Sequence, residues 1–276
     1  MNEKENLINE EIQKKLVEYI DIINIQFREP ATTIFASLPL LINNINSNNT
    51  EKAIEGLQNI YKNTYSILKG INNAAILAKI MDNHRFDRSM LDFSTLVESV
   101  FNSAKLILPD YFELDLKIED TCFVEGSSTF LTAGLLNLLS NSFDYRQEDN
   151  VKVSVCVKKE NGRCVLLYRD NSLGIKSHIA QDIFNPFFTC DPYADGEYSK
   201  RMGVGLYIAQ QAVINAGGTI MLQTEFSEGV GYIISIPDKT AMRGNVLRCN
   251  SAEFLLDRYS QVYVQLCEHC KLPDLP

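Results

Sequence analysis

Two long stretches at the start of the chain repeat apolar residues at every third or fourth position. The first, over residues 4–46, contains no glycine, and its series is Ile8, Ile12, Leu16, Tyr19, Ile23, Phe27, Pro30, Ile34, Leu38, Leu41 and Ile45. The second, over residues 50–81, has a heptad-like stripe at Ile54, Leu57, Tyr61, Thr64, Leu68, Ile71, Ala75 and Ala78. Both spacings predict long amphipathic helices. Pro30 and Pro39 should bend the first helix, and the Asn- and Ser-rich residues 43–49 should form the turn between the two.

Two such helices form a hairpin whose apolar stripe one partner cannot fully bury. Pairing two hairpins into a four-helix bundle resolves this, so the pattern predicts a homodimer.

The pattern changes after residues 83–85 to short alternating strands between helices. The expected helices cover residues 96–104, with Asp92 or Ser94 near the start, 128–145 and 206–215. The expected strands cover residues 114–118, 151–157, 164–168, 219–224 and 232–236, with a turn at 160–162. This order predicts an α+β chain, in which the helical hairpin precedes a two-layer α/β sandwich.

The remaining residues, from Asp238 on, predict one more amphipathic helix. Its apolar face would carry Leu255, Tyr259, Val262 and Leu266. The chain therefore divides into a dimerisation hairpin at 1–84, an α/β domain at 85–240 and a helical tail at 241–276.

Composition narrows the classes of partner. A net charge of −9 argues against general binding of nucleic acid or anionic membranes, but not against one magnesium-bound nucleotide. No apolar run approaches the ~18 residues of a membrane span, and the polar N-terminus lacks a signal-peptide layout, so we expect a cytoplasmic protein.

The seven cysteines are scattered and odd in number, which favours reduced thiols over a disulfide framework. Cys267, Glu268, His269 and Cys270 could supply metal ligands, but no second Cys-x-x-Cys accompanies them, so packing of the tail is the favoured interpretation.

Four segments of the α/β domain carry the candidate chemistry. Asn137 and Asn141 lie one helical turn apart, and hydrated Mg²⁺ with phosphates would satisfy both amides. Residues 169–175 follow a strand and place Asp170 and Gly174 where an exocyclic amine and a ring could bind. Residues 183–188 give aromatic anchors for a polar, lid-like segment that ends in basic residues, and residues 203–206 open a helix with glycines that suit an anion.

In this order and spacing the segments resemble the N, G1, F and G2 boxes of the histidine-kinase and gyrase type of ATPase (GHKL, or Bergerat, fold). With the hairpin, residues 5–237 resemble the core of a bacterial two-component sensor histidine kinase. The resemblance implies ATP or ADP with Mg²⁺ as ligands, and response-regulator or other signalling proteins as partners. It implies that Asn141 holds the metal, and that these residues contact the nucleotide: Asn137, Asn141, Asp144, Tyr145, Asp170, Gly174, Lys200, Arg201, Gly203, Gly205 and Leu206.

The phosphate-accepting motif is the main departure from this family. Kinases of this type carry a motif close to His-Glu-Leu-Arg-Thr-Pro, and the chain reads Ile25-Gln26-Phe27-Arg28-Glu29-Pro30. Arg28 and Pro30 fix the register, so Ile25 stands at the histidine position, and its alkyl side chain offers no lone pair to a phosphoryl group. Gln26 replaces the acidic neighbour, and Glu29 stands where Thr or Asn commonly supports phosphatase activity.

Two pocket positions also depart from the family. Asp144 stands where Lys or Arg is usual, which disfavours polyphosphate unless the carboxylate helps to hold the metal. Ser172 replaces the first glycine of the G1 box.

Three functions remain open from the sequence. The first is a dimeric pseudo-histidine kinase that binds nucleotide and partner proteins without autophosphorylation, with Ile25 as a hydrophobic docking residue. The second is an ATP-dependent kinase of a partner protein, and the third is a nucleotide-free dimeric scaffold. The sequence thus leaves open whether the chain is an enzyme.

Overall fold

The computed structural model describes residues 3–82, 86–147, 149–189, 202–223, 229–240 and 246–271. The chain divides into two compact units, residues 1–75 with 187–203, and residues 76–186 with 204–276. In the described part of the chain, no helix combines the length and hydropathy needed to cross a membrane.

Two long helices dominate the first unit, α1 (Glu3–Asn46) and α2 (Thr50–Met81), and both were predicted. The helix α1 continues through both of its prolines, and their bending effect stays a prediction. The turn is shorter than predicted, because residues 43–46 still belong to α1 and the Ser47 hydroxyl donates to the Asn43 carbonyl at 2.9 Å. Asn48 then adopts the left-handed conformation, with φ 54°.

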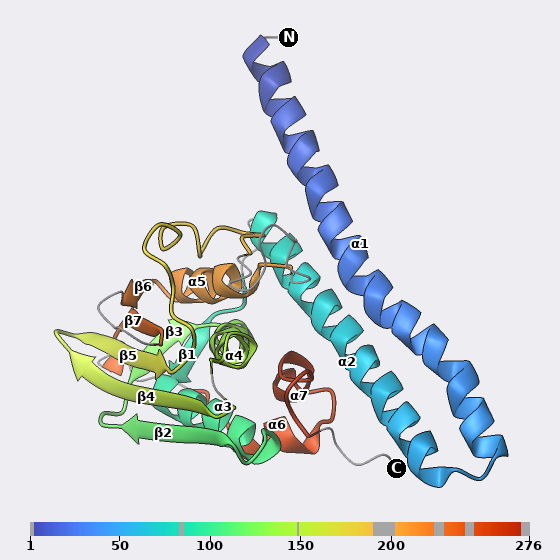
Figure 1. The fold of residues 1–276 in the computed structure, drawn as a ribbon. Coiled ribbons are helices and arrows are strands. Elements are labelled where there is room, and N and C mark those ends of the chain that lie inside the picture. The colour runs from blue at the N-terminus through green and yellow to red at the C-terminus, as the bar shows by residue number, and fades with distance from the viewer. Residues whose placement is uncertain are drawn as a thin grey trace. The chain divides into compact units, whose positions relative to one another are not determined.

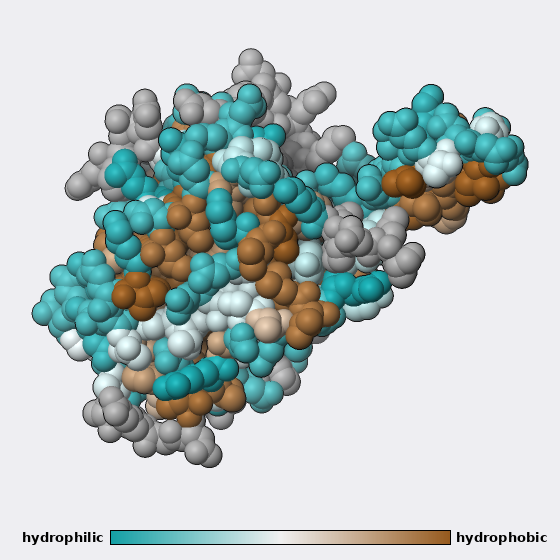
Figure 2. All heavy atoms as spheres, turned by 90° about the horizontal axis from the view of Figure 1, so that it is seen from below, coloured by the Kyte–Doolittle hydropathy of each residue, from teal (hydrophilic) through white to brown (hydrophobic). Residues whose placement is uncertain are grey.

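Small residues of α2 let the two helices approach. A side chain at Gly70 would come within 2.9 Å of the Phe27 ring, and one at Gly56 within 3.5 Å of Leu41. The predicted apolar stripe of α2 lies elsewhere on the helix, and Ile54, Leu57 and Ile71 remain exposed in the single chain. Figure 2 shows apolar surface in brown at its right, near the loop end of the hairpin, where residues of both helices such as Ile42, Ile45 and Ile54 are exposed.

The second unit is a sheet covered on one face by helices (Figure 1). Its helices are α3 (Phe93–Ile107), α4 (Ser128–Asp144), α5 (Gly205–Asn215), α6 (Ser251–Leu256) and α7 (Gln261–Gln265). Its strands are β1 (Ser89–Asp92), β2 (Phe112–Ile118), β3 (Phe123–Gly126), β4 (Val151–Glu160), β5 (Arg163–Asp170), β6 (Thr219–Gln223) and β7 (Gly231–Pro237). The predicted hairpin followed by an α/β sandwich is thereby confirmed.

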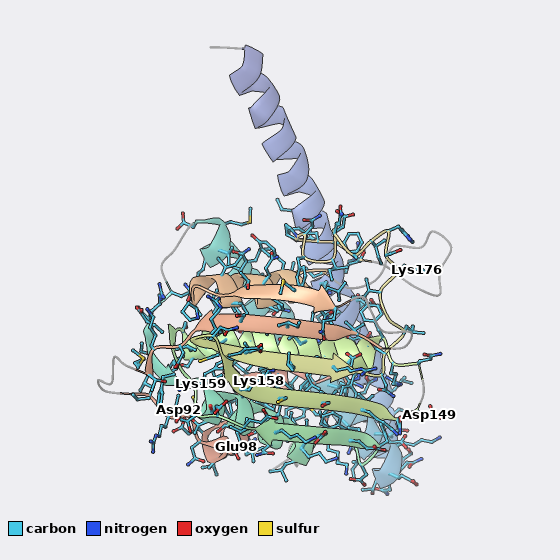
Figure 3. The ribbon with its side chains drawn as sticks, turned by 90° about the vertical axis from the view of Figure 1, so that its left-hand side faces the viewer. Asp92, Glu98, Asp149, Lys158, Lys159 and Lys176 are labelled. Atoms are coloured by element: carbon cyan, nitrogen blue, oxygen red, sulfur yellow. The ribbon has the colours of Figure 1, made fainter. Side chains whose placement is uncertain are left out.

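The main sheet has the order β2-β4-β5-β7-β6, with β2 parallel to β4 and the other pairs antiparallel. Figure 3 views its uncovered face, with Lys158 and Lys159 at one end of the strands and Asp149 and Lys176 at the other. The strand β4 alternates buried and more exposed residues, because its valines face the helical layer. The end near Asp149 is also where β5 terminates in Asp170.

The observed structure differs from the sequence prediction at the β1–β3 ladder and in the C-terminal tail. A two-stranded ladder joins β1 to β3, and each of these strands has only four residues, too few for an alternating pattern to stand out. The tail is not one helix, as predicted, but the two short helices α6 and α7. The chain breaks between them because the Ser260 hydroxyl donates to the Phe254 carbonyl and Asp257 accepts from the Tyr259 N–H. Tyr259 is consequently 66% exposed.

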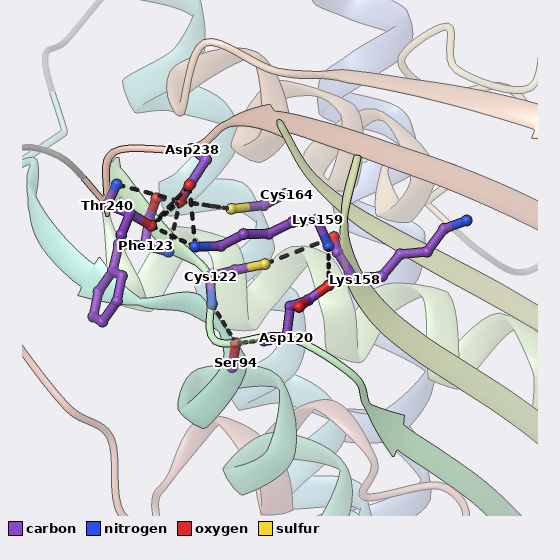
Figure 4. Close-up of polar contacts among 9 residues, drawn as sticks. All are labelled: Ser94, Asp120, Cys122, Phe123, Lys158, Lys159, Cys164, Asp238 and Thr240. Carbon is purple, nitrogen blue, oxygen red and sulfur yellow. Dashed lines mark hydrogen bonds and ion pairs between the residues drawn. The ribbon is translucent and has the colours of Figure 1, made fainter. Parts of the chain in front are cut away.

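A polar cluster fastens the end of β7 to its neighbours (Figure 4). The Asp238 carboxylate accepts from the Phe123 N–H at 3.3 Å and from the Thr240 hydroxyl at 2.7 Å, and lies 3.2 Å from the Lys159 ammonium. Partial burial opposes its ionisation, but the bonds from Thr240, Lys159 and Phe123 outweigh this and hold the pKa of Asp238 below its ordinary value.

Candidate functional site

The Asp170 carboxylate is the centre of one polar group. It lies buried at the end of β5, and its Oδ1 accepts from the N–H groups of Ser172 and Val230 at 3.0 and 3.1 Å and from the Ser172 hydroxyl at 2.7 Å. Its Oδ2 accepts from the Ser142 hydroxyl of α4. Backbone and side-chain donors thus hold the carboxylate in one orientation.

Behind Ser142 lies Tyr168, whose hydroxyl is 2.6 Å from the Ser142 oxygen. Burial, reinforced by the nearby Asp170 charge, raises the pKa of Tyr168 well above its ordinary value. Tyr168 therefore stays protonated and can donate to Ser142, which in turn donates to Asp170 Oδ2. A carboxylate oxygen has two lone pairs, so Oδ2 keeps one for an incoming amine.

Two glycines shape the backbone beside this carboxylate. Gly229 has φ 81°, and a Cβ at this position would overlap the Asp170 carbonyl oxygen. Gly174 has φ 76°, and a Cβ on it would lie 3.4 Å from the Gly229 carbonyl. Both conformations disfavour any residue with a side chain, so this corner of the site depends on glycine. Ser172, the departure in the G1 box, is accommodated as a donor to Asp170.

A second polar group lies along α4, where Asn137, Asn141 and Asp144 share one face by their spacing. Asn137 is buried; its amide nitrogen donates to the Ala133 carbonyl at 2.9 Å, and its oxygen accepts from Gln265 of α7 at 2.7 Å. A Cβ at Gly205 would lie 2.9 Å from this oxygen, which places Asn137 beside the first residue of α5. The structure thus brings together the predicted residues Asn137 and Gly205.

Asp144, at the other end of this face, also contacts the tail. The His269 ring nitrogen Nε2 is 2.9 Å from Asp144 Oδ1, and the imidazole stacks on Phe143 with ring centroids 5.1 Å apart. Among the described residues, Asp144, Glu268 and His269 place possible metal-ligand atoms within 4.8 Å of one another. Glu268 and His269, which the sequence offered as possible ligands, therefore lie close to Asp144.

The other predicted residues are more dispersed. Tyr145 directly follows α4, is half-buried and accepts at its carbonyl from the Leu173 N–H at 3.0 Å. Leu206 lies in the first turn of α5, and Gly203 adopts φ 66° just before it. Lys200 and Arg201 lie outside the described residues.

The predicted acceptor motif lies on α1. Ile25 is part of that helix, and its side chain lies outside the described part of the structure. Gln26 is half-buried, whereas Arg28 and Glu29 are exposed.

Three contributors were missed by sequence reasoning, Ser142, Val230 and Gln265, and so was the contact of His269 with α4. Ser142 follows Asn141 directly and Val230 lies between Gly229 and Gly231, so local context could have indicated both. Nothing in the sequence links Gln265 or His269 to α4, since each lies more than a hundred residues from its partner.

Residues 126–240 match the family described as "Histidine kinase-, DNA gyrase B-, and HSP90-like ATPase". This segment is a histidine-kinase-type ATPase domain. The chain is 26% identical over 175 residues to the CAI-1 autoinducer sensor kinase/phosphatase CqsS of Vibrio cholerae, covering 62% of this chain and 24% of that protein. It is 23% identical over 233 residues to the autoinducer 2 sensor kinase/phosphatase LuxQ of Vibrio vulnificus, covering 83% of this chain and 27% of that protein.

The chain thus spans about a quarter of the length of these two relatives. Among solved structures, the histidine kinase AdeS of Acinetobacter baumannii matches with a TM-score of 0.54 at 16% identity, over 77% of this chain and 97% of that one. Full-length ShkA in complex with AMPPNP matches with a TM-score of 0.52 at 16% identity, over 68% of this chain and 39% of that one. These likenesses support the fold of a helical hairpin followed by a histidine-kinase-type ATPase domain.

Proposed function

We propose that the chain is a dimeric, histidine-kinase-like signalling protein that binds ATP or ADP and does not phosphorylate itself at the usual position. The observation that carries the proposal is the buried Asp170 carboxylate, oriented by its donors with one lone pair of Oδ2 left over. This is the group to which an adenine amine would donate.

The remaining pocket residues fit a nucleotide in the manner of the family. Asn137 and Asn141 would lie at the phosphates, with Asn141 holding Mg²⁺, because amide oxygens suit this hard cation. The ring of Tyr145 would lie against the adenine, while Gly174, Gly203, Gly205 and Leu206 would shape the backbone around the nucleotide. Lys200 and Arg201 would contact it from the lid. The negative charge of Asp144 by itself disfavours phosphate binding. Bound Mg²⁺ would offset this by neutralising part of the phosphate charge.

Ile25 removes the usual phosphoryl acceptor, since a hydrocarbon side chain has no nucleophilic atom. Gln26 lacks the charge that would help an imidazole to lose a proton. We therefore assign the hairpin a role in binding a response-regulator or other signalling protein, rather than in phosphate relay. We assign dimerisation to residues 1–84, nucleotide binding to residues 85–240 and the helical tail to residues 241–276, as the sequence predicts.

The exposed stripe of α2 supports a homodimer. Replacing Leu57 by Asp should weaken dimerisation by at least about 2 kcal/mol per subunit, because it removes apolar burial and buries a charge. Sedimentation analysis across concentrations would measure this shift, with Lys62→Asp as a control at an exposed polar position of the same helix. Equal dimerisation of the two variants would refute a bundle built on this stripe.

Calorimetry with ADP and Mg²⁺ tests the nucleotide site. The unaltered chain should bind, and Asp170→Asn should weaken binding roughly 10- to 100-fold, the loss expected for a hydrogen bond to a charged group. Asp115→Asn, at an exposed side chain of β2, is the matched control. If the chain does not bind nucleotide at millimolar concentration, the proposal is wrong and the nucleotide-free dimeric scaffold is favoured. Transfer of label from ATP to an added partner, abolished by Asn141→Ala, would establish the partner-kinase function.

A further inference from the structure

The C-terminal segment 261–271 packs closely on the helical layer of the ATPase domain. Val262, Leu266 and Cys267 are each fully buried. The Gln261 side chain donates to the Thr129 carbonyl at 3.2 Å, and the Lys271 N–H donates to the Ile107 carbonyl at 2.8 Å. Figure 1 shows α7 lying beside α4. The segment is thus an ordered part of the domain.

Two polar contacts of this segment meet the nucleotide face of α4 on either side of Asn141. Gln265 donates to the Asn137 oxygen at 2.7 Å, and His269 lies 2.9 Å from Asp144. The Gln265–Asn137 pair is buried, so the Gln265 N–H and the Asn137 oxygen satisfy each other away from water. The segment therefore spans the part of α4 at which phosphates and Mg²⁺ would bind.

The same contacts use groups that a nucleotide would need. One N–H of the Asn137 amide donates to the Ala133 carbonyl and its oxygen accepts from Gln265, so these two bonds fix the orientation of the side chain. They leave the oxygen one lone pair, rather than two, for the phosphate and Mg²⁺ assembly. Asp144 is the residue that reverses the charge usual in the family, and it contacts His269 of the tail. A single role for this face of α4, binding of the chain's own tail, accounts for both the Gln265–Asn137 bond and the reversed charge at Asp144.

We propose that residues 261–271 act as a built-in competitor for the phosphate end of the nucleotide site. The tail leaves α4 when nucleotide binds, and nucleotide binds weakly while Gln265 and His269 hold their contacts. The proposal rests on the nucleotide binding proposed above. Linkage requires that the two effects be reciprocal: if the tail lowers nucleotide affinity, nucleotide must loosen the tail to the same degree.

The experiment measures affinity for ADP with Mg²⁺ on the full chain and on Gln265→Ala, His269→Ala and the double variant. We expect the double variant to bind about tenfold more tightly or better, because a hydrogen-bonded amide pair and a charge-assisted contact no longer oppose binding. Tyr259→Ser, at an exposed position between α6 and α7, should bind like the unaltered chain. Hydrogen exchange of residues 261–271 in the unaltered chain should accelerate when nucleotide is added.

The outcomes separate the two proposals. Equal affinity in all variants, with unchanged exchange of the tail, would overturn the competition and leave nucleotide binding intact. Weaker binding in the double variant would also overturn it, since the tail would then support the site. Failure of every variant to bind nucleotide would overturn the proposed function and the competition together. A thermal melt of each variant checks that the domain remains folded.

Discussion

The two ends of the candidate site differ in what holds them. At the adenine end, Asp170 is fixed by donors from Ser172 just after β5, from Ser142 of α4 and from the Val230 backbone just before β7, all within the ATPase domain proper. At the phosphate end, Asn137 and Asp144 are held by the C-terminal tail. On the proposed function, the part that would recognise the base keeps its carboxylate oriented for a nucleotide, whereas the part that would meet the phosphates departs from the family at Asp144. The proposed loss of the phosphoryl acceptor at Ile25 agrees with this division.

The largest effect on stability should come from Gly229→Ala, a substitution at the adenine end of the site. A Cβ there would overlap the Asp170 carbonyl and force an alanine into left-handed backbone, so we expect a loss of more than about 3 kcal/mol in the free energy of unfolding. Gly162→Ala is the matched control, because φ is 72° but no atom lies within 4 Å of the added carbon; it should cost about 1 kcal/mol. Denaturant unfolding measures both, and equal costs would show that the close approach to Asp170 is unimportant.

Ser142→Ala tests how Asp170 is oriented. Removing the hydroxyl leaves the buried Tyr168 hydroxyl and Asp170 Oδ2 each without one partner, which should cost about 1–3 kcal/mol of stability. Ser154→Ala, at an exposed position of β4, should change stability little. A neutral result for Ser142→Ala would mean that the network does not fix the carboxylate.

Asp144→Asn probes the phosphate end. It removes a negative charge near the phosphates and weakens the contact with His269, so nucleotide affinity should rise several-fold, by about 1 kcal/mol. Asp115→Asn, on the exposed side of β2, is the control. Weaker binding of ADP with Mg²⁺ by Asp144→Asn would instead identify Asp144 as a metal ligand.

The smallest effect should come from Asp238, which follows β7 at the end of the strand opposite Asp170. Its pKa is lower in the folded chain, so its contribution to stability is present above the unfolded value and is lost as pH falls through the folded one. Asp238→Asn should therefore cost at most about 1 kcal/mol at pH 7, and less once the pH falls below the ordinary pKa of an aspartate. The affinity for nucleotide should not change. A large change would show that the polar cluster around Asp238 is energetically coupled to the nucleotide site.

Periodicity predicted most of the fold, because long helices and alternating strands repeat a pattern over many residues. It failed for the four-residue strand β1 and for the tail, where Asp257 and Ser260 break an otherwise helical series. The candidate site was partly predictable, since Asp170 and Gly174 lie close together in sequence. The contacts of Gln265 and His269 with α4 were not, because they depend on tertiary packing that no local pattern records.

One measurement tests the central claim most directly. The chain is incubated with γ-labelled ATP and Mg²⁺, and bound nucleotide and protein-bound phosphate are measured on the same sample. The account predicts bound nucleotide and no acid-labile phosphate on the chain. Acid-labile label on the protein, mapped to His84, His178 or His269, would contradict it, because a displaced acceptor would then have replaced the missing one.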